Sequence, residues 1–159
     1  MKVFISHKRE DAHTAALVAQ QLRANFVETY LDVLDPFVVN DGKALTEHIK
    51  SSLNSCTDIL VVMSNATRLS QWVPFEIGMA AQVDLPTVTY LTENVQLPDY
   101  LTYWPCLHKL ADISKYVAVR NSTAQEIQRY YQGRYAVAAA TQKAHETRAF
   151  YQNLKNALK

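Results

Sequence analysis

The sequence predicts an α/β fold in which a doubly wound parallel sheet of five strands is covered by helices on both faces. Short apolar runs alternate with helical patterns five times along the chain, and this alternation is typical of a parallel sheet. Right-handed crossovers make the doubly wound arrangement the default for such a pattern. A length of 159 residues and an apolar content of 48% suit a domain with a sizeable core.

Five short runs rich in β-branched and aromatic residues predict the strands. They are residues 2–6, 26–32, 59–64, 86–91 and 106–110. The strongest is the third, where a continuous apolar run from Ile59 to Met63 predicts a buried strand. Pro86 is compatible with the fourth strand because it is the first residue there, and the fifth run is the weakest.

Apolar positions repeating every three to four residues predict the helices between these strands. In chain order, helices are expected around residues 15–22, over 43–54, from the Ser70 region to about residue 84, over 112–119, and from Ser122 onward. Glu10 and Asp11 lie near the start of the first helix, where the helix dipole favours carboxylates. Thr123 and Glu126 have capping-box spacing at the start of the last helical region, and Gly133 is expected to break or bend that region.

Composition and charge exclude several classes of function. The formal net charge is +1, so nothing indicates binding to nucleic acid or to an anionic membrane. The run from Ile59 to Met63 is too short to span a bilayer, and the first residues do not have the layout of a signal peptide. Cys56 and Cys106 are far apart and indicate neither a disulfide framework nor a metal site. We therefore expect a cytoplasmic protein.

Other common site motifs are absent from the sequence. The five histidines lack metal-ligand spacing, and no Ser/His/Asp triad stands out. The three glycines form neither a phosphate-binding loop nor a dinucleotide fingerprint. A receiver-type phosphorylation site would need an aspartate at the end of the third strand, where Met63 and Ser64 stand instead. We expect no metal and no cofactor.

Trp72 and Glu76 form the most informative pair in the sequence. They are four residues apart on a predicted helix and therefore lie on one face, one turn from each other. If Val73 caps this helix, Pro74 is its first residue and Glu76 its third, where a glutamate suits the helix dipole and can reach a free backbone N–H. The alternative is a carboxylate in a pocket walled by tryptophan, which could stabilise positive charge during glycosidic cleavage.

Polar residues follow the first three predicted strands and would meet at one edge of the sheet. They are Ser6, His7, Lys8 and Arg9 after the first strand, Asp32 after the second, and Ser64 after the third. Open α/β sheets bind ligands at this edge. A serine at a strand end is also a common cap, and a basic pair on a turn is often only solvated, so structural and binding roles both remain open.

Four segments resemble, in order and spacing, the motifs of TIR (Toll/interleukin-1 receptor) domains, especially bacterial ones. They are residues 3–11, residues 30–32 with the following loop and helix to about Leu53, residues 60–64, and residues 70–76. The resemblance covers about residues 2–91. It implies a flavodoxin-like sheet of five strands, so we expect a TIR domain over residues 1–120 and a C-terminal helical extension over residues 121–159, either packed on it or projecting from it.

The resemblance also implies an activity. Many TIR domains are NAD nucleosidases that cleave the nicotinamide–ribose bond and produce ADP-ribose or a cyclic isomer, which in bacteria can serve as an anti-phage signal. The family's catalytic glutamate lies four residues after a tryptophan, and Glu76 and Trp72 match that pattern. Lys8 and Arg9 match basic positions that could contact NAD phosphates or ribose. NAD is a substrate here and not a cofactor.

The loop at residues 33–42 matches the family's loop for self-assembly and gating of the site. Phe37 belongs to three adjacent apolar residues there, which would form a contact surface if exposed. The resemblance implies a homo-oligomer through TIR–TIR contacts, with a possible separate effector protein. Two alternatives remain: a non-catalytic TIR adaptor, and a nucleoside deoxyribosyltransferase-like enzyme with a glutamate nucleophile. The sequence does not distinguish hydrolysis from cyclisation.

Overall fold

Five parallel strands form one sheet in the order β2-β1-β3-β4-β5. The computed structural model describes residues 1–31, 42–92, 94–132 and 138–159. The strands are β1 (Lys2–Ser6), β2 (Glu28–Leu31), β3 (Asp58–Met63), β4 (Thr87–Leu91) and β5 (Cys106–Leu107). The strand order reverses direction at β1 and β3, so the sheet is doubly wound as predicted, with its topological switch point between these two strands.

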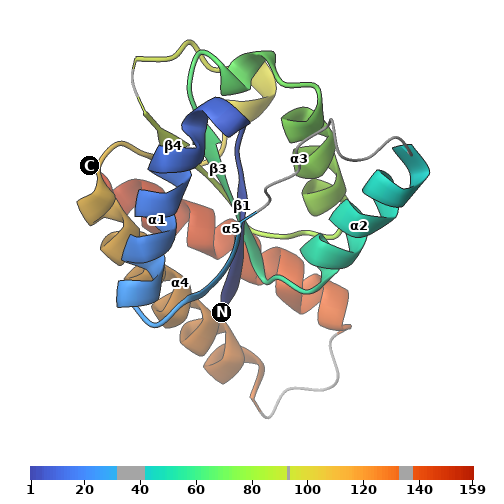
Figure 1. The fold of residues 1–159 in the computed structure, drawn as a ribbon. Coiled ribbons are helices and arrows are strands. Elements are labelled where there is room, and N and C mark those ends of the chain that lie inside the picture. The colour runs from blue at the N-terminus through green and yellow to red at the C-terminus, as the bar shows by residue number, and fades with distance from the viewer. Residues whose placement is uncertain (32–41, 93, 133–137) are drawn as a thin grey trace.

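Helices cover both faces of this sheet (Figure 1). The long helices are α1 (Ala12–Ala24), α2 (Gly42–Asn54), α3 (Trp72–Gln82), α4 (Leu110–Tyr131) and α5 (Ala139–Ala157). Three short 3-10 helices are η1 (Arg9–Asp11), η2 (Thr67–Leu69) and η3 (Asp99–Leu101). Figure 1 shows α1 to the left of β1 and β3, with α2 and α3 to their right.

The alternation of side chains along β1 explains this division into two layers. Val3 and Ile5 belong to the hydrophobic cluster that includes residues of α1, α4 and α5. Phe4 belongs to the opposite cluster, which includes residues of α2 and α3. Successive strand residues point to opposite faces, so one short strand anchors both layers. Every residue of β3 is buried, as its apolar run predicts for a strand covered on both faces.

The predicted division of the C-terminal region into a short helix at 112–119 and a new helix from Ser122 is wrong. Helix α4 runs without interruption for 22 residues. Thr123, predicted to lie at a cap, is buried in the middle of α4 and accepts a hydrogen bond from Asn153 Nδ2 of α5 at 3.1 Å. The capping-box spacing was misleading because Thr123 bonds across to a neighbouring helix.

Helix α4 instead begins at Leu110, which shortens the predicted fifth strand. Strand β5 ends at Leu107 and not at residue 110. The Asp112 carboxylate accepts the backbone N–H groups of His108 and Lys109, each at 3.1 Å. Burial would raise the pKa of Asp112, but these two hydrogen bonds and nearby lysines hold it below its ordinary value.

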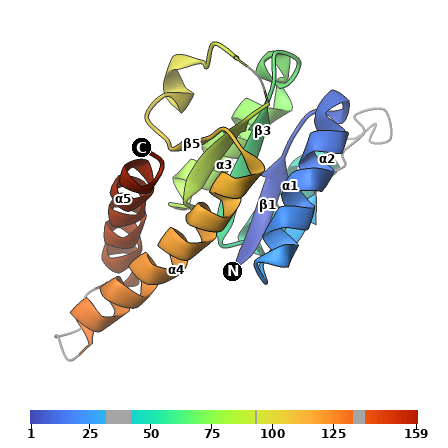
Figure 2. The same cartoon turned by 90° about the vertical axis from the view of Figure 1, so that its left-hand side faces the viewer.

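Helix α5 packs along α4 and completes the core (Figure 2). Its residues Phe150 and Leu154 are fully buried in the same cluster as β1 and α1. The Tyr151 hydroxyl accepts the backbone N–H of Thr87 at 2.9 Å, where β4 begins. These contacts pack helix α5 against the sheet domain. Whether residues 121–159 form a separable unit stays a prediction.

A buried charge network connects β3, α4 and α5. Arg120 Nε donates to Asp58 Oδ1 at 2.8 Å, and Arg120 Nη1 donates to Glu146 Oε1. Burial opposes the charge of Arg120, but both carboxylates together raise its pKa. Asp58 is completely buried, and its Oδ2 atom has no hydrogen-bond partner among the residues that the structure describes. In the parts of the chain that the structure describes, no helix combines the length and the apolar character needed to cross a membrane.

Candidate active site at the carboxyl edge of the sheet

The side chain of Glu76 lies buried beside the end of β1. Only 3% of this residue is exposed, and its Oε2 atom accepts a hydrogen bond from the hydroxyl of Ser6. Ser6 is the last residue of β1 and is fully buried. A buried hydrogen bond is costly to leave unmade, so this contact holds the carboxyl group against the strand end. The structure thus brings together two residues that the sequence places 70 positions apart.

Helix α3 begins two residues earlier than it would if Val73 were its cap, and this changes the interpretation of Glu76. The helix starts at Trp72, and the Ser70 hydroxyl accepts the N–H groups of Trp72 and Val73 at 3.2 and 3.3 Å. Glu76 is the fifth helical residue and not the third, so the predicted capping role is wrong. Its carboxylate instead accepts a hydrogen bond from Ser6 and is buried at the end of β1.

Trp72 lies one helical turn before Glu76 and is partly exposed. Its exposed fraction is 36%, compared with 3% for Glu76. The indole packs edge-on against Phe75, with ring centroids 6.0 Å apart. An aromatic surface that is partly open to solvent therefore lies one helical turn from the residue with the buried carboxylate. Such a surface can stack on a flat ring of a ligand.

A second buried network joins the two loops that flank this carboxylate. Asp11 Oδ2 accepts hydrogen bonds from the hydroxyls of Ser64 and Thr67. Ser64 Oγ in turn accepts the N–H groups of Ala66 and Thr67 at 3.0 and 3.1 Å. The Lys8 N–H donates to Thr67 Oγ1 at 3.2 Å. These bonds tie the β1–α1 loop to the β3–α3 loop and give Ser64 a role in loop geometry; its predicted contact with substrate stays a prediction.

His7, Lys8 and Arg9 follow β1, and they differ in exposure and in their contacts. Lys8 Nζ pairs with Glu10 Oε1 at 2.9 Å; the Lys8 side chain is partly exposed and the Glu10 side chain is more exposed. That ion pair lowers the pKa of Glu10, which the solvent reaches freely. His7 is half-buried, and its Nδ1 lies 3.2 Å from the Ile5 carbonyl oxygen. Arg9 is exposed at the start of η1.

Two predicted site residues, Asp32 and Phe37, lie outside the described residues. The same is true of the predicted gating loop up to residue 41. Their contacts with ligand or with another copy stay predictions. Across residues 1–31, 42–92, 94–132 and 138–159, no group of three or more histidine, cysteine, aspartate or glutamate side chains is arranged to hold a metal ion.

The position of Asp11 was not predicted from the sequence. Its place near a helix start predicts an interaction with the helix dipole, yet its carboxylate is buried and accepts hydrogen bonds from side chains of the β3–α3 loop. Thr67 was missed entirely. The only sequence signal was the pairing of an early acidic residue with hydroxyl residues just after the strongest strand. That signal is weak because the partners are more than 50 residues apart.

Comparison with known proteins places this arrangement in a family. The family model described as "TIR domain" matches residues 3–131. The chain belongs to the TIR domain family. No curated protein matches this TIR domain. A similar solved structure is described as the activated Roq1 resistosome directly recognizing the pathogen effector XopQ (TIR domains). The two sequences are 18% identical, the alignment covers 98% of each chain, and the TM-score is 0.47.

The extent of the family match agrees with the continuity of α4. The match ends at residue 131, the last residue of that helix. In this TIR domain, β1 supplies Ser6 and α3 supplies Trp72 and Glu76. Helix α5, which contributes to the core, lies beyond the matched residues.

Proposed function

We propose that this TIR domain cleaves NAD at the bond between nicotinamide and ribose, with Glu76 as the catalytic residue. The single observation that carries the proposal is the buried Glu76 carboxylate, held by Ser6 at the edge where open α/β sheets bind ligands. Membership of the TIR family supports it, since the Trp72 and Glu76 spacing matches that of the family's enzymes.

Cleavage of this bond needs stabilised positive charge more than a strong acid. The bonding electron pair leaves with nicotinamide, which departs as a neutral ring because it was cationic in NAD. The ribose becomes oxocarbenium-like, and a fixed carboxylate nearby stabilises that charge as it develops. Water then attacks the anomeric carbon and loses a proton, which gives ADP-ribose; attack from within the same molecule gives a cyclic isomer.

The surrounding residues have separate roles in this proposal. Ser6 helps to position the carboxylate, because its hydroxyl donates a hydrogen bond to Glu76 Oε2. Trp72 provides a partly exposed wall for the nicotinamide–ribose end. Lys8 and Arg9 are placed after β1, where phosphates of the bound dinucleotide would pass. We place the product in bacterial anti-phage signalling, with a separate effector protein as its receiver.

The decisive experiment measures nicotinamide release and the products from NAD by mass spectrometry. The purified chain is tested at low and high concentration, because the proposed self-association would complete the site only at high concentration. Glu76→Gln keeps the size of the side chain and removes its charge. We expect release to fall at least a hundredfold in Glu76→Gln and to stay unchanged in Glu126→Gln, which alters an exposed glutamate on α4.

The outcomes separate this proposal from its alternatives. Turnover that survives Glu76→Gln contradicts the assignment of the catalytic residue. No turnover at any concentration supports a non-catalytic interaction module. Cleavage of deoxynucleosides in preference to NAD supports the transferase alternative, in which a glutamate is the nucleophile.

A further inference from the structure

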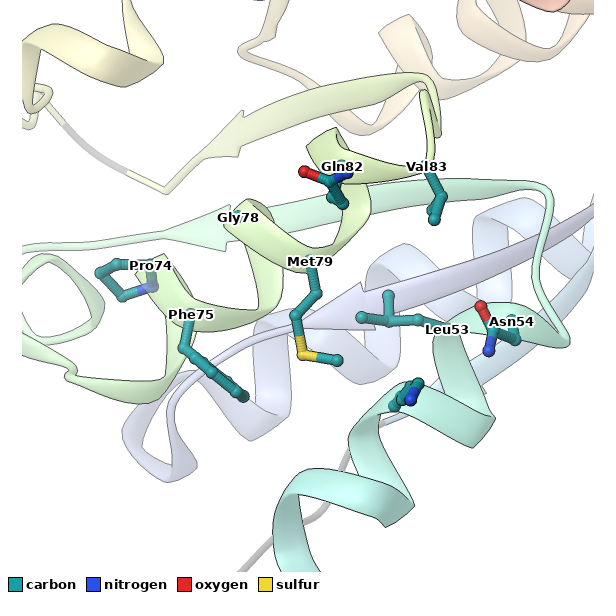
Figure 3. A pocket seen from close by; sticks show the side chains of 9 residues that line it. Leu53, Asn54, Pro74, Phe75, Gly78, Met79, Gln82 and Val83 are labelled. Carbon is teal, nitrogen blue, oxygen red and sulfur yellow. The ribbon is translucent and has the colours of Figure 1, made fainter. Parts of the chain in front are cut away.

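An apolar groove on the α2–α3 face remains unexplained by the proposed chemistry. Its volume is about 400 Å³, and it runs along α3 beside the end of α2 (Figure 3). Figure 3 shows Leu53 of α2 and Phe75 and Met79 of α3 beside this space. Gly78 and Val83 also line the groove, which is almost wholly apolar. A hollow of this size accommodates a large apolar side chain.

Gly78 provides a second indication that the groove receives a ligand. It lies inside α3, where a glycine is about 1 kcal/mol less favourable than an alanine. Among the described residues, a Cβ atom added at this position would meet nothing within 4 Å. Packing against these residues therefore does not require a glycine here. A partner that approaches the helix backbone closely would require one.

Phe26 has the properties of a side chain that fills such a groove. It is 99% exposed, and its φ angle of 60° is in the left-handed region that favours glycine. An exposed phenylalanine in this conformation is unfavourable for the isolated chain by about 1–3 kcal/mol. Hydrogen bonds from Phe26 N–H to the Arg23 carbonyl and from Val27 N–H to the Leu22 carbonyl, at 2.9 and 3.1 Å, fix the turn that presents it.

The charges around these two features are complementary. Exposed Arg23 and Glu28 flank Phe26 in the chain. Lys50 lines the groove, and exposed Glu47 lies one helical turn away in the adjoining hollow. Glu28 of one copy can therefore pair with Lys50 of another, and Arg23 with Glu47. Complementary charges of this kind fix the register of an association more than its strength.

We infer that Phe26 of one copy inserts into the α2–α3 groove of a second copy. A chain cannot fill its own groove, because Phe26 follows α1 on one face of the sheet while α2 and α3 cover the other. Each copy thus carries one knob and one hole. Such a contact is heterologous and produces open rows or closed rings of copies. This contact is separate from the one predicted for Phe37, and it does not depend on NAD cleavage.

Sedimentation velocity over a range of protein concentrations tests the inference. Phe26→Gly removes the ring at a position where glycine is favoured, so the variant should unfold at a higher temperature and yet dissociate at least tenfold more easily. Gly78→Leu fills the groove and should weaken association by a similar factor. Leu69→Ala, which removes an apolar side chain that is 73% exposed, is the matched control and should leave association unchanged.

Exchanging the charges of Glu28 and Lys50 distinguishes this contact from non-specific association. Glu28→Lys should weaken association, and adding Lys50→Glu should restore it. Association that is unaffected by Phe26→Gly, or a double charge variant no better than the single one, overturns the inference, as does a wild-type chain that stays monomeric at every concentration. Because the readout is association alone, these outcomes are independent of whether NAD is cleaved.

Discussion

At the scale of single residues, the contact between Ser6 and Glu76 determines how the proposed chemistry is arranged. The carboxylate comes from a helix and its partner from a strand end, so tertiary folding must be complete before the site exists. Glu76 could be proposed from the sequence because its spacing from Trp72 is local and matches the pattern of the family. Asp11 and Thr67 were not predictable, because their hydrogen bonds join segments that only the sheet brings together.

We predict that Ser6→Ala lowers nicotinamide release about ten- to a hundredfold while the fold persists. The variant leaves the Glu76 carboxylate in place but removes the hydroxyl that orients it, and a small displacement of a catalytic group has effects of this size. Loss of one buried hydrogen bond should also lower the free energy of unfolding by about 1–3 kcal/mol.

Separate measurement of kcat and KM checks this prediction. A positioning role lowers kcat more than it raises KM, and Ser6→Thr, which retains a hydroxyl, should recover part of the loss. Ser51→Ala, on the exposed side of α2, serves as the control. Equal loss in Ser6→Ala and Ser6→Thr contradicts the role assigned to the hydroxyl.

At the scale of elements, the local sequence pattern predicted most strands and helices, but it did not predict the bounds of the C-terminal helices. The first four strands are close to their predicted bounds because each is a short apolar run between polar turns. Helix α4 was divided in the prediction because Thr123 and Glu126 imitate a cap. The actual helix continues because Thr123 is buried against α5, a contact that local sequence does not specify.

The charge network around Arg120 should contribute to the stability of the fold. Arg120→Met should lower the free energy of unfolding by about 3–5 kcal/mol, because it leaves the buried Asp58 carboxylate without its cationic partner. Arg120 also pairs with Glu146, which is 21% exposed, so Glu146→Gln should lower the free energy of unfolding less than Arg120→Met. Urea unfolding of both single variants, Arg120→Met and Glu146→Gln, measures the difference.

A double variant tests whether buried charge is the cause. Asp58→Asn combined with Arg120→Met removes both charges and should be more stable than Arg120→Met alone. If the double variant loses as much free energy of unfolding as Asp58→Asn and Arg120→Met lose together as single variants, the loss comes from packing. The cation also lies over the Phe150 ring at 5.7 Å, so a packing contribution is measurable in the same cycle.

At the scale of the whole molecule, the question is whether residues 121–159 are an addition or part of the fold. Phe150 and Leu154 are fully buried in the cluster that includes β1 and α1. Burial of each such side chain contributes about 1.5–3 kcal/mol, and a typical domain is stable by only about 5–15 kcal/mol. The core therefore depends on α5, although the family match ends before it.

We predict that a chain ending at Gln132 loses cooperative unfolding. Such a chain lacks α5 and exposes the face of α4 and the start of β4 that α5 covers. Circular dichroism during heating should show a broad transition in place of a sharp one. Phe150→Ala in the full chain should keep cooperativity and lose about 3–5 kcal/mol. A sharp transition in the shortened chain would instead support a separable domain ending near residue 120.

The shortness of β5 has a consequence for how copies of this domain can meet. With two residues, it offers almost no backbone to which another strand could add. At the opposite edge, β2 has four residues in the described part of the chain. Short edge strands protect a sheet against growth by strand addition, which is a common route to aggregation. Crowded copies are therefore directed toward contacts between side chains, which a single substitution can reverse.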